Sequence, residues 1–186
     1  MDLLLHLAVV AAIYCIFAIA LNIEVGYTGL FNFGHVAFFA LGAYASALLS
    51  LHGSPFWMAL LAGVACAALG GLLIGVPSLK LQGDYFGIAT LGFAEIVRLV
   101  LQNQVAWTKG PMGLPGIPRP EIFSWHVDTL PAYLLLSLGA ALLTLAVTGF
   151  LTASPFGRVL RAIRDDETAA AVLGKNPLAY KLASFV

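Results

Sequence analysis

Charged side chains are scarce in this sequence. Lys, Arg, Asp and Glu make up 10% of its 186 residues, whereas hydrophobic residues make up 61%. Soluble domains carry roughly 25% charged residues, so a chain with a mean hydropathy of +0.96 is expected to fold in a lipid bilayer. Its nine basic and nine acidic residues cancel. No overall field therefore favours nucleic acid or an acidic partner.

Cysteines are few, and the sequence has no catalytic pattern. Cys15 and Cys66 lie within apolar runs without metal-site spacing, and we interpret them as packing residues. The sequence has no GxxxxGK[ST] phosphate loop, and its apolar runs hold no Ser/His, paired Asp or metal-ligand set. We therefore expect no catalytic centre, cofactor or metal. The first apolar run lacks a preceding basic region and is too long for a signal peptide, so we expect it to remain as a membrane span.

Five stretches are long and apolar enough to cross a bilayer as helices, which takes about 20 residues each. A further helix is expected to begin at Asn176 and Pro177, but only ten residues from Pro177 onward remain. The predicted fold is an all-α bundle, one transmembrane domain over residues 1–186, with the start of a sixth span. The chain is expected to be a C-terminally truncated piece. The five predicted spans are residues 3–23, 29–51, 56–76, 85–104 and 130–152.

Basic residues outside the spans predict the orientation, because Lys and Arg concentrate in cytoplasmic loops. With the N-terminus outside, five fall on the inner side and two on the outer side. All three tryptophans then lie near outer span ends, where an aromatic belt is expected. The proline-rich connection, residues 105–129, is predicted to be an extracytoplasmic loop. The inner residues are Lys80, Arg158, Arg161, Arg164 and Lys175, and the outer ones are Lys109 and Arg119.

Polar residues within the spans are candidates for function, because ionisable groups are costly in a bilayer. Glu95 and Arg98 are three residues apart and share a helix face. They form either a structural ion pair or part of a polar substrate path. Glycines around Asn32 and His35 permit an unwound helix that binds polar ligands, and the alternative is a tightly packed helix start. The predicted substrate-pathway residues are Asn32, His35, Tyr44, Glu95 and Arg98.

Small residues recur every four positions along the third predicted span. Such a ridge lets helices approach closely, either within one chain or between two subunits. Its members are Ala59, Gly63, Ala67, Gly71 and Gly75.

One dense polar block follows the uncharged stretch 129–153. Ser154 and Pro155 are typical of a helix start and Gly174 of a helix end, so residues 154–174 are predicted to form one short amphipathic helix. Three adjacent acidic residues argue against a helix lying on anionic lipid. A docking surface for a cytoplasmic protein accounts for both signs of charge. The predicted apolar stripe is Phe156, Leu160, Ile163 and Ala170, opposite Arg158, Arg161, Arg164 and Asp165.

Four motifs carry a resemblance to a known family. They are "GYTGLFNFGHVAFFALGAY", "LKLQGDYFGIATLGFAEIVRLVL", "TKGPMGLPGIP" and "SPFGRVLRAIRDDETAAAVLGKNP". Together, in this order, they resemble the permeases of branched-chain amino acid ABC importers, of the LivM type. In ABC importers a permease helix with a Glu-Ala-Ala, three residues, Gly pattern fits a groove of the ATP-hydrolysing subunit. Ala169, Ala170 and Gly174 keep that spacing, whereas Glu167 stands one position early and Glu24 departs from an expected apolar residue.

The resemblance implies a permease subunit of the bacterial inner membrane that binds no ATP itself. Its partners would be ABC ATPase subunits, a second permease subunit, an external substrate-binding protein and membrane lipid. Branched-chain or other small neutral amino acids would be the substrates, with urea or short-chain amides as the alternative. An ion-coupled secondary transporter using Glu95, or a structural membrane subunit, would be alternatives of another class. The implied coupling residues are Phe156, Gly157, Arg158, Arg161, Arg164, Asp165, Asp166, Glu167, Ala169, Ala170 and Gly174.

Overall fold

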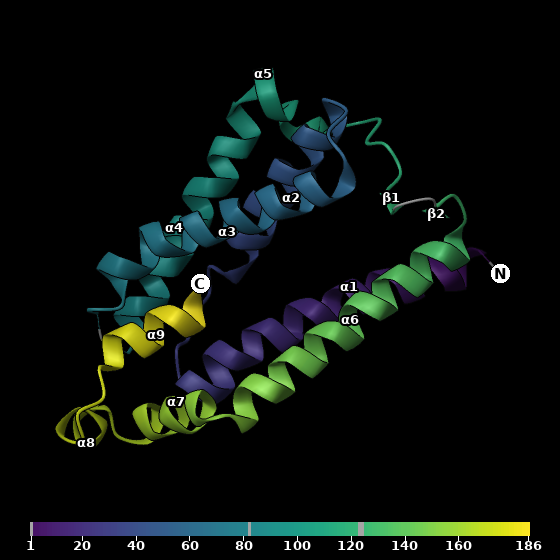
Figure 1. The fold of residues 1–186 in the computed structure, drawn as a ribbon. Coiled ribbons are helices and arrows are strands. Elements are labelled where there is room, and N and C mark those ends of the chain that lie inside the picture. The colour runs from purple at the N-terminus through teal and green to yellow at the C-terminus, as the bar shows by residue number, and fades with distance from the viewer. Residues whose placement is uncertain (1, 82, 123–124) are drawn as a thin grey trace. The chain divides into compact units, whose positions relative to one another are not determined.

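The computed structural model describes residues 2–81, 83–122 and 125–186. Nearly all of the regular structure in these residues is helical, as the sequence predicts (Figure 1). Contacts divide the chain into two compact units. The first comprises Met1–Leu30 with Val127–Ser184, and the second comprises Phe31–His126 with Phe185–Val186.

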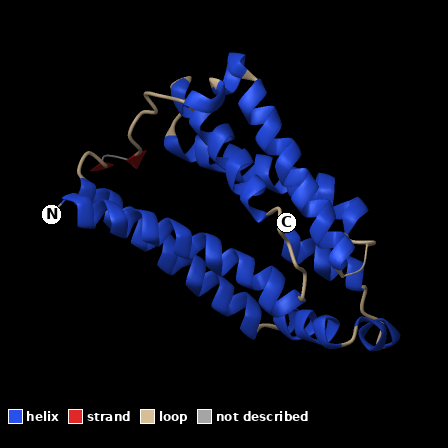
Figure 2. Cartoon of the chain, turned by 180° about the vertical axis from the view of Figure 1, so that it is seen from behind, coloured by secondary structure: helices blue, strands red, loops and turns tan. Residues whose placement is uncertain are grey.

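The first unit is built on two long helices, α1 (Asp2–Asn22) and α6 (Leu130–Ala153), which pack side by side. They run in the same direction, as both views of the ribbon show (Figure 1, Figure 2). Two spans run parallel only when an odd number of crossings separates them, and the three predicted spans between α1 and α6 satisfy this condition. The unit continues through α7 (Pro155–Asp165), α8 (Glu167–Val172) and most of α9 (Pro177–Phe185).

A π-helix, η1 (Ile23–Thr28), extends α1 directly. Its wider turn is closed by the Thr28 hydroxyl, which donates to the carbonyl oxygen of Ile23 at 3.0 Å. The helix ends at Gly29, which has a left-handed φ of 74° and donates its N–H to the carbonyl oxygen of Glu24. Glu24, the departure from the family pattern, lies buried in this π-helix at 3% exposure. π-Helices are rare and are frequently found at functional sites.

The second unit contains α2 (His35–Leu51), α3 (Phe56–Ser78) and α4 (Asp84–Asn103). The ridge of small residues on α3 packs within this unit, because a side chain at Gly63 would meet the carbonyl oxygen of Gly42 on α2. A short helix α5 (Val105–Thr108) and a 3₁₀ turn η2 (Gly110–Met112) follow. Two-residue strands, β1 (Glu121–Ile122) and β2 (Trp125–His126), then pair antiparallel.

Each predicted span corresponds to one helix, and one boundary is wrong. The second span was predicted to begin at Gly29, but α2 begins only at His35, because residues 29–34 leave the helical path. Within the described residues, Asp2–Thr28, Phe56–Ser78 and Leu130–Ala153 are long and apolar enough to cross a membrane. α2 is apolar but shorter. The count of five spans therefore stays a prediction.

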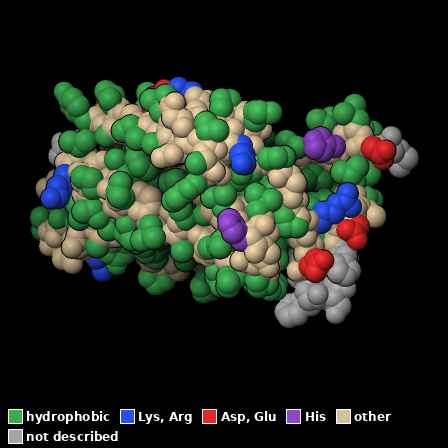
Figure 3. Space-filling view, turned by 90° about the horizontal axis from the view of Figure 1, so that it is seen from above, with side chains coloured by type: hydrophobic (Ala, Val, Ile, Leu, Met, Phe, Trp, Pro, Cys, Tyr) green, Lys and Arg blue, Asp and Glu red, His purple; other side chains and the backbone are tan. Residues whose placement is uncertain are grey.

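Hydrophobic side chains cover much of the molecular surface, as the face in Figure 3 shows. Large apolar residues are exposed along α1, α3 and α6, for example Leu4, Leu73 and Leu142. A soluble protein rarely exposes apolar surface on this scale, whereas lipid is the expected neighbour of such helices. The chain is a polytopic, predominantly helical membrane protein.

Candidate functional site

The charged segment begins where α6 ends. The Ser154 hydroxyl accepts a hydrogen bond from the backbone N–H of Phe156 at 3.2 Å, and Pro155 occupies the first turn of α7. A side chain at Gly157 would overlap the backbone of Thr152. The predicted cap is therefore confirmed, and the chain can turn from α6 into α7 because position 157 has no side chain.

The predicted apolar stripe of α7 faces the chain. Leu160 and Ile163 are buried at 1% and 3% exposure, and Ala170 of α8 is buried as well. Phe156 stacks on Tyr180 of α9 with ring centroids 5.7 Å apart. Because these contacts seat the apolar face, the arginines of α7 are left at the surface.

The segment consists of two helices rather than the single helix predicted from the sequence. Asp166 adopts an extended conformation (φ −154°, ψ 102°) and ends α7. Its carboxylate then accepts a hydrogen bond from the backbone N–H of Ala169 at 2.9 Å and caps α8. An aspartate at an N-cap favours this break over a continuous helix. Gly174 closes α8 with a left-handed φ of 77°, as predicted.

Several charges of the segment have partners within the first unit. Glu167 pairs with Lys181 of α9, Arg164 with Asp165, and the Arg161 guanidinium lies 5.9 Å from the ring centroid of Tyr27. Arg164 also donates a hydrogen bond to the carbonyl oxygen of Gly26 at 2.5 Å. The prediction treated these residues as one outward-facing set, but part of the set is directed at the chain itself.

The tip of α8 presents an apolar surface. Val172 and Leu173 are 83% and 79% exposed, beside the charged residues of α7 and α8. Large apolar side chains ringed by charges are typical of protein contact sites. Sequence reasoning missed these two residues, although they occupy two of the three variable positions before Gly174.

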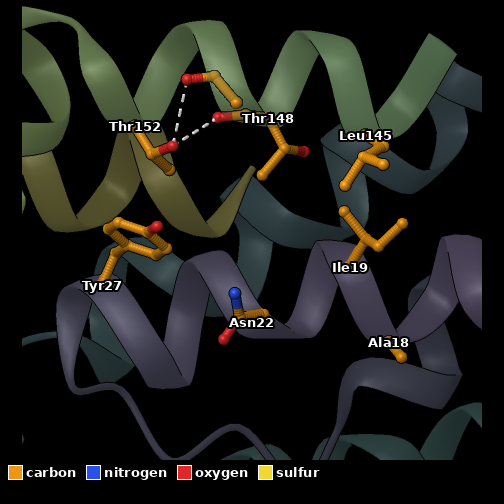
Figure 4. A pocket seen from close by; sticks show the side chains of 8 residues that line it. Ala18, Ile19, Asn22, Tyr27, Leu145, Thr148 and Thr152 are labelled. Carbon is orange, nitrogen blue, oxygen red and sulfur yellow. Dashed lines mark hydrogen bonds between the residues drawn. The ribbon is translucent and has the colours of Figure 1, made fainter. Parts of the chain in front are cut away.

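A groove of about 370 Å³ lies between α1, η1 and α6. The hydroxyl of Thr152 is used within α6, where it donates to the carbonyl oxygens of Thr148 and Gly149 (Figure 4). None of the lining side chains carries a formal charge, so the groove offers no counter-charge to a zwitterionic ligand. The lining residues are Ala18, Ile19, Asn22, Tyr27, Leu145, Thr148, Gly149 and Thr152.

In the second unit, residues 31–34 form a compact turn against α4. The buried Asn32 accepts a hydrogen bond from the N–H of Gly34 at 2.8 Å. Thr90, which is fully buried, accepts from the N–H of Phe33 at 3.2 Å and donates to the carbonyl oxygen of Gly87. A side chain at Gly34 would overlap the carbonyl oxygen of Thr90. The turn is thus fastened to α4, and the backbone N–H groups of Phe33 and Gly34 both have partners.

Sequence reasoning did not select Thr90. Thr90 stands three residues after Gly87, so its hydroxyl shares one face of α4 with a residue that has no side chain. This spacing is the sequence pattern that could have identified Thr90. Asn32 and His35, by contrast, were selected from the sequence. Asn32 lies within the turn and His35 follows it directly. Tyr44 lies nine positions after His35 on α2, which places it on the opposite side of that helix. The predicted pathway residues on α2 therefore do not converge.

Glu95 and Arg98 form the predicted ion pair on α4. The Arg98 guanidinium donates through Nε and Nη2 to the two carboxylate oxygens of Glu95, at 2.8 and 2.5 Å. Its Nη1 donates to the side-chain oxygen of Gln102 at 2.8 Å. Both ionic side chains are about half exposed, whereas Thr90 and Val97 mark the buried face of the helix. The three polar groups form a stripe along α4 that faces away from this packing.

The described residues contain no group of three or more His, Cys, Asp or Glu placed to hold a metal ion. Hydrogen bonds, ion pairs and helix contacts gather at two locations, the turn at residues 31–34 and the α7–α8 segment.

Comparison with known proteins agrees with this arrangement. Residues 3–186 match the family model described as "Branched-chain amino acid transport system / permease component". The chain is 38% identical, over 96% of its length, to the high-affinity branched-chain amino acid transport system permease protein LivM of Salmonella typhimurium, and 37% identical, over the same share, to LivM of Escherichia coli. It is 28% identical over 88% of its length to the LivH permease protein of Escherichia coli.

The chain spans 48% of the length of the two LivM relatives and 58% of LivH. No solved structure matches it. The family model nonetheless covers almost the entire chain, and the helical membrane fold is the one that the family requires. This protein belongs to the family of permease components of branched-chain amino acid transport systems.

Proposed function

We propose that this chain is part of the membrane-spanning permease of an ABC importer. The importer carries branched-chain or other small neutral amino acids across the bacterial inner membrane. The permease itself hydrolyses no ATP. It works with ABC ATPase subunits in the cytoplasm, a second LivH-like permease subunit, and an external binding protein that delivers the substrate to the loop at residues 105–129.

One observation carries the proposal. The apolar stripe of the α7–α8 segment is buried against the first unit. Val172 and Leu173 nevertheless remain exposed beside a charged surface. A helix pair outside the spans with an apolar tip and charges of both signs suits a groove in a partner protein. The relatives named as permease proteins of a transport system support an ATPase as that partner.

The turn at residues 31–34 and the polar stripe of α4 are two separate candidates for the substrate path, because they lie on different faces of α4. A helix broken by glycines exposes backbone groups that can bind a polar substrate. The stripe provides the ionic groups that the groove beside α6 lacks. Asn32 and His35 belong to the first candidate and Glu95 and Arg98 to the second, whereas Tyr44 lies on the opposite side of α2 from His35.

An ion-coupled secondary transporter is the less favoured alternative. Its coupling ion would need access to the Glu95 carboxylate, but both oxygens of that carboxylate are engaged by Arg98. It also gives no reason for the exposed tip of α8. A permease for urea or short-chain amides would share the ATPase and differ only in the ligand of the binding protein.

Reconstitution tests the proposal directly. The full-length permease, the ATPase that copurifies with it and the binding protein are placed in liposomes, and uptake of radioactive leucine is measured with ATP inside or outside. We expect leucine uptake only when ATP is on the cytoplasmic side. ATP-driven uptake of urea in place of leucine would reassign the substrate. Uptake driven by a proton or sodium gradient without ATP would overturn the proposal.

A further inference from the structure

The C-terminal end of the first span is contacted by the charged segment at three neighbouring points. Arg161 and Arg164 are three residues apart on α7 and therefore share one helix face. Arg161 covers the ring of Tyr27 at a cation–π distance of 5.9 Å. Arg164 donates to the carbonyl oxygen of Gly26, and its aliphatic stem lies where a side chain of Gly29 would be.

The bond to Gly26 satisfies a group that the helix cannot satisfy itself. The last four carbonyl groups of a helix lack an intrahelical partner, and Gly26 stands in the last turn of η1. A cation is also favoured there, because the C-terminal end of a helix carries partial negative charge. Asp165 accepts from Nε and Nη2 of Arg164 at 3.2 and 3.1 Å, which holds the guanidinium in place.

Gly29 is required at this contact for two reasons. Its φ of 74° lies in the left-handed region, and a Cβ would be 2.8 Å from Cγ of Arg164. The second condition disappears if α7 moves away from η1, whereas the first belongs to the backbone of Gly29 itself. The contact of α7 with the end of the first span therefore depends on the absence of a side chain at Gly29.

We infer that Arg164 is a positioning residue that fixes the π-helical end of the first span and so couples movement of the α7–α8 segment to that end. The inference rests on the proposed function. Arg164 then acts on its own chain, while Val172 and Leu173 contact the ATPase. A displacement of α7 by the partner removes the cation from Gly26 and frees the π-helical end of the first span.

Two readouts on the full-length chain test this role. The first is hydrogen–deuterium exchange of residues 23–30 in the permease alone, in nanodiscs. Arg164→Met is expected to speed this exchange about tenfold, since the carbonyl of Gly26 loses its partner. Arg164→Lys, which keeps a donor and the charge, is expected to restore most of the protection. Lys80→Met serves as the control, because Lys80 is an exposed cation of the second unit, and it should leave the exchange unchanged.

The second readout is leucine uptake per ATP hydrolysed by the reconstituted complex. Arg164→Met is expected to keep the ATPase bound and to lower this ratio at least tenfold, with partial recovery in Arg164→Lys. Unchanged exchange at residues 23–30, or an unchanged ratio, would overturn the inference. Loss of the ATPase from the Arg164→Met complex alone would also overturn it, because Arg164 would then be a partner contact. Absence of an ATPase from the wild-type complex would instead refute the proposed function, and the exchange result would still stand.

Discussion

Nζ of Lys181 lies 2.5 Å from Oε2 of Glu167, so an ion pair joins α9 to the first residue of α8. Glu167 stands one position before the glutamate of the family's coupling pattern. A position shifted by one residue turns by about 100° around a helix, and here the carboxylate meets Lys181 of its own chain. The side chain of Lys181 is only 15% exposed. Glu167 therefore holds α8 against α9.

This pair predicts a modest effect on stability. Glu167→Gln should lower the free energy of unfolding of the full-length protein by at most about 1 kcal/mol, the range of partly exposed ion pairs. Combining it with Lys181→Met should cost less than the sum of the single changes. A double-mutant cycle, measured by thermal unfolding in detergent, gives the coupling energy. Strict additivity of the two changes would contradict the pairing.

The turn at residues 31–34 predicts a contrast between two glycines. Gly34→Ala places a methyl group against the carbonyl oxygen of Thr90, and overpacking of this kind costs about 1–3 kcal/mol. Gly92→Ala is the matched control, because nothing lies within 4 Å of that position on α4. It should be neutral or stabilising, since alanine is favoured over glycine in helices. Equal thermal unfolding temperatures for both variants would show that the turn does not pack on Thr90.

The ion pair on α4 predicts a partial rescue. Glu95→Gln leaves Arg98 without its carboxylate within the span, so leucine uptake or folded yield should fall. Adding Arg98→Gln removes the orphaned charge and should restore part of the loss. Fluorescence-detected size exclusion of the full-length protein measures the folded yield. A double variant worse than the sum of the single variants would argue against mutual neutralisation.

The orientation predicts which side of the membrane each loop faces. Lys109 is exposed after α5, in the connection predicted to be extracytoplasmic. In a background with Cys15 and Cys66 replaced by Ala, a cysteine at position 109 should react with an impermeant maleimide added to intact cells. A cysteine at position 80 should react only after the membrane is opened. The reverse pattern would invert the topology.

Much of the fold follows from the sequence, because long apolar runs in lipid have few alternatives to helices. The caps at Ser154, Asn176 and Gly174 were also predictable, since each matches a local signal. The apolar stripe of Phe156, Leu160, Ile163 and Ala170 followed from its spacing in the same way. These features depend on neighbours within one or two turns.

The remaining features depend on contacts between distant residues. The spacing of Gly87 and Thr90 marks one face of α4, but it does not predict that the Thr90 hydroxyl accepts from the N–H of Phe33. No local pattern predicts that Arg164 reaches Gly26. The break at Asp166 was missed for a different reason. The helical periodicity of the segment continues across the break. Only the hydrogen bond from the N–H of Ala169 to the Asp166 carboxylate favours two helices. The ion pair of Glu95 and Arg98 in the polar stripe of α4 was predictable from its spacing. The hydrogen bond from Arg98 to Gln102, one turn later, was not predicted.

The most direct test of the central claim, that α8 contacts a partner ATPase, is the rate of ATP hydrolysis by the assembled full-length complex with and without binding protein. Leu173→Asp places a charge on a side chain that is 79% exposed, so it should not disturb the permease fold. Gly174→Leu strains a left-handed position by roughly 1 kcal/mol. Leu173→Met is the matched control. Both variants should insert normally and lose stimulation by the binding protein, whereas the control keeps it. Normal stimulation in both variants, at matched subunit content, would contradict the assignment of α7–α8 as the coupling surface.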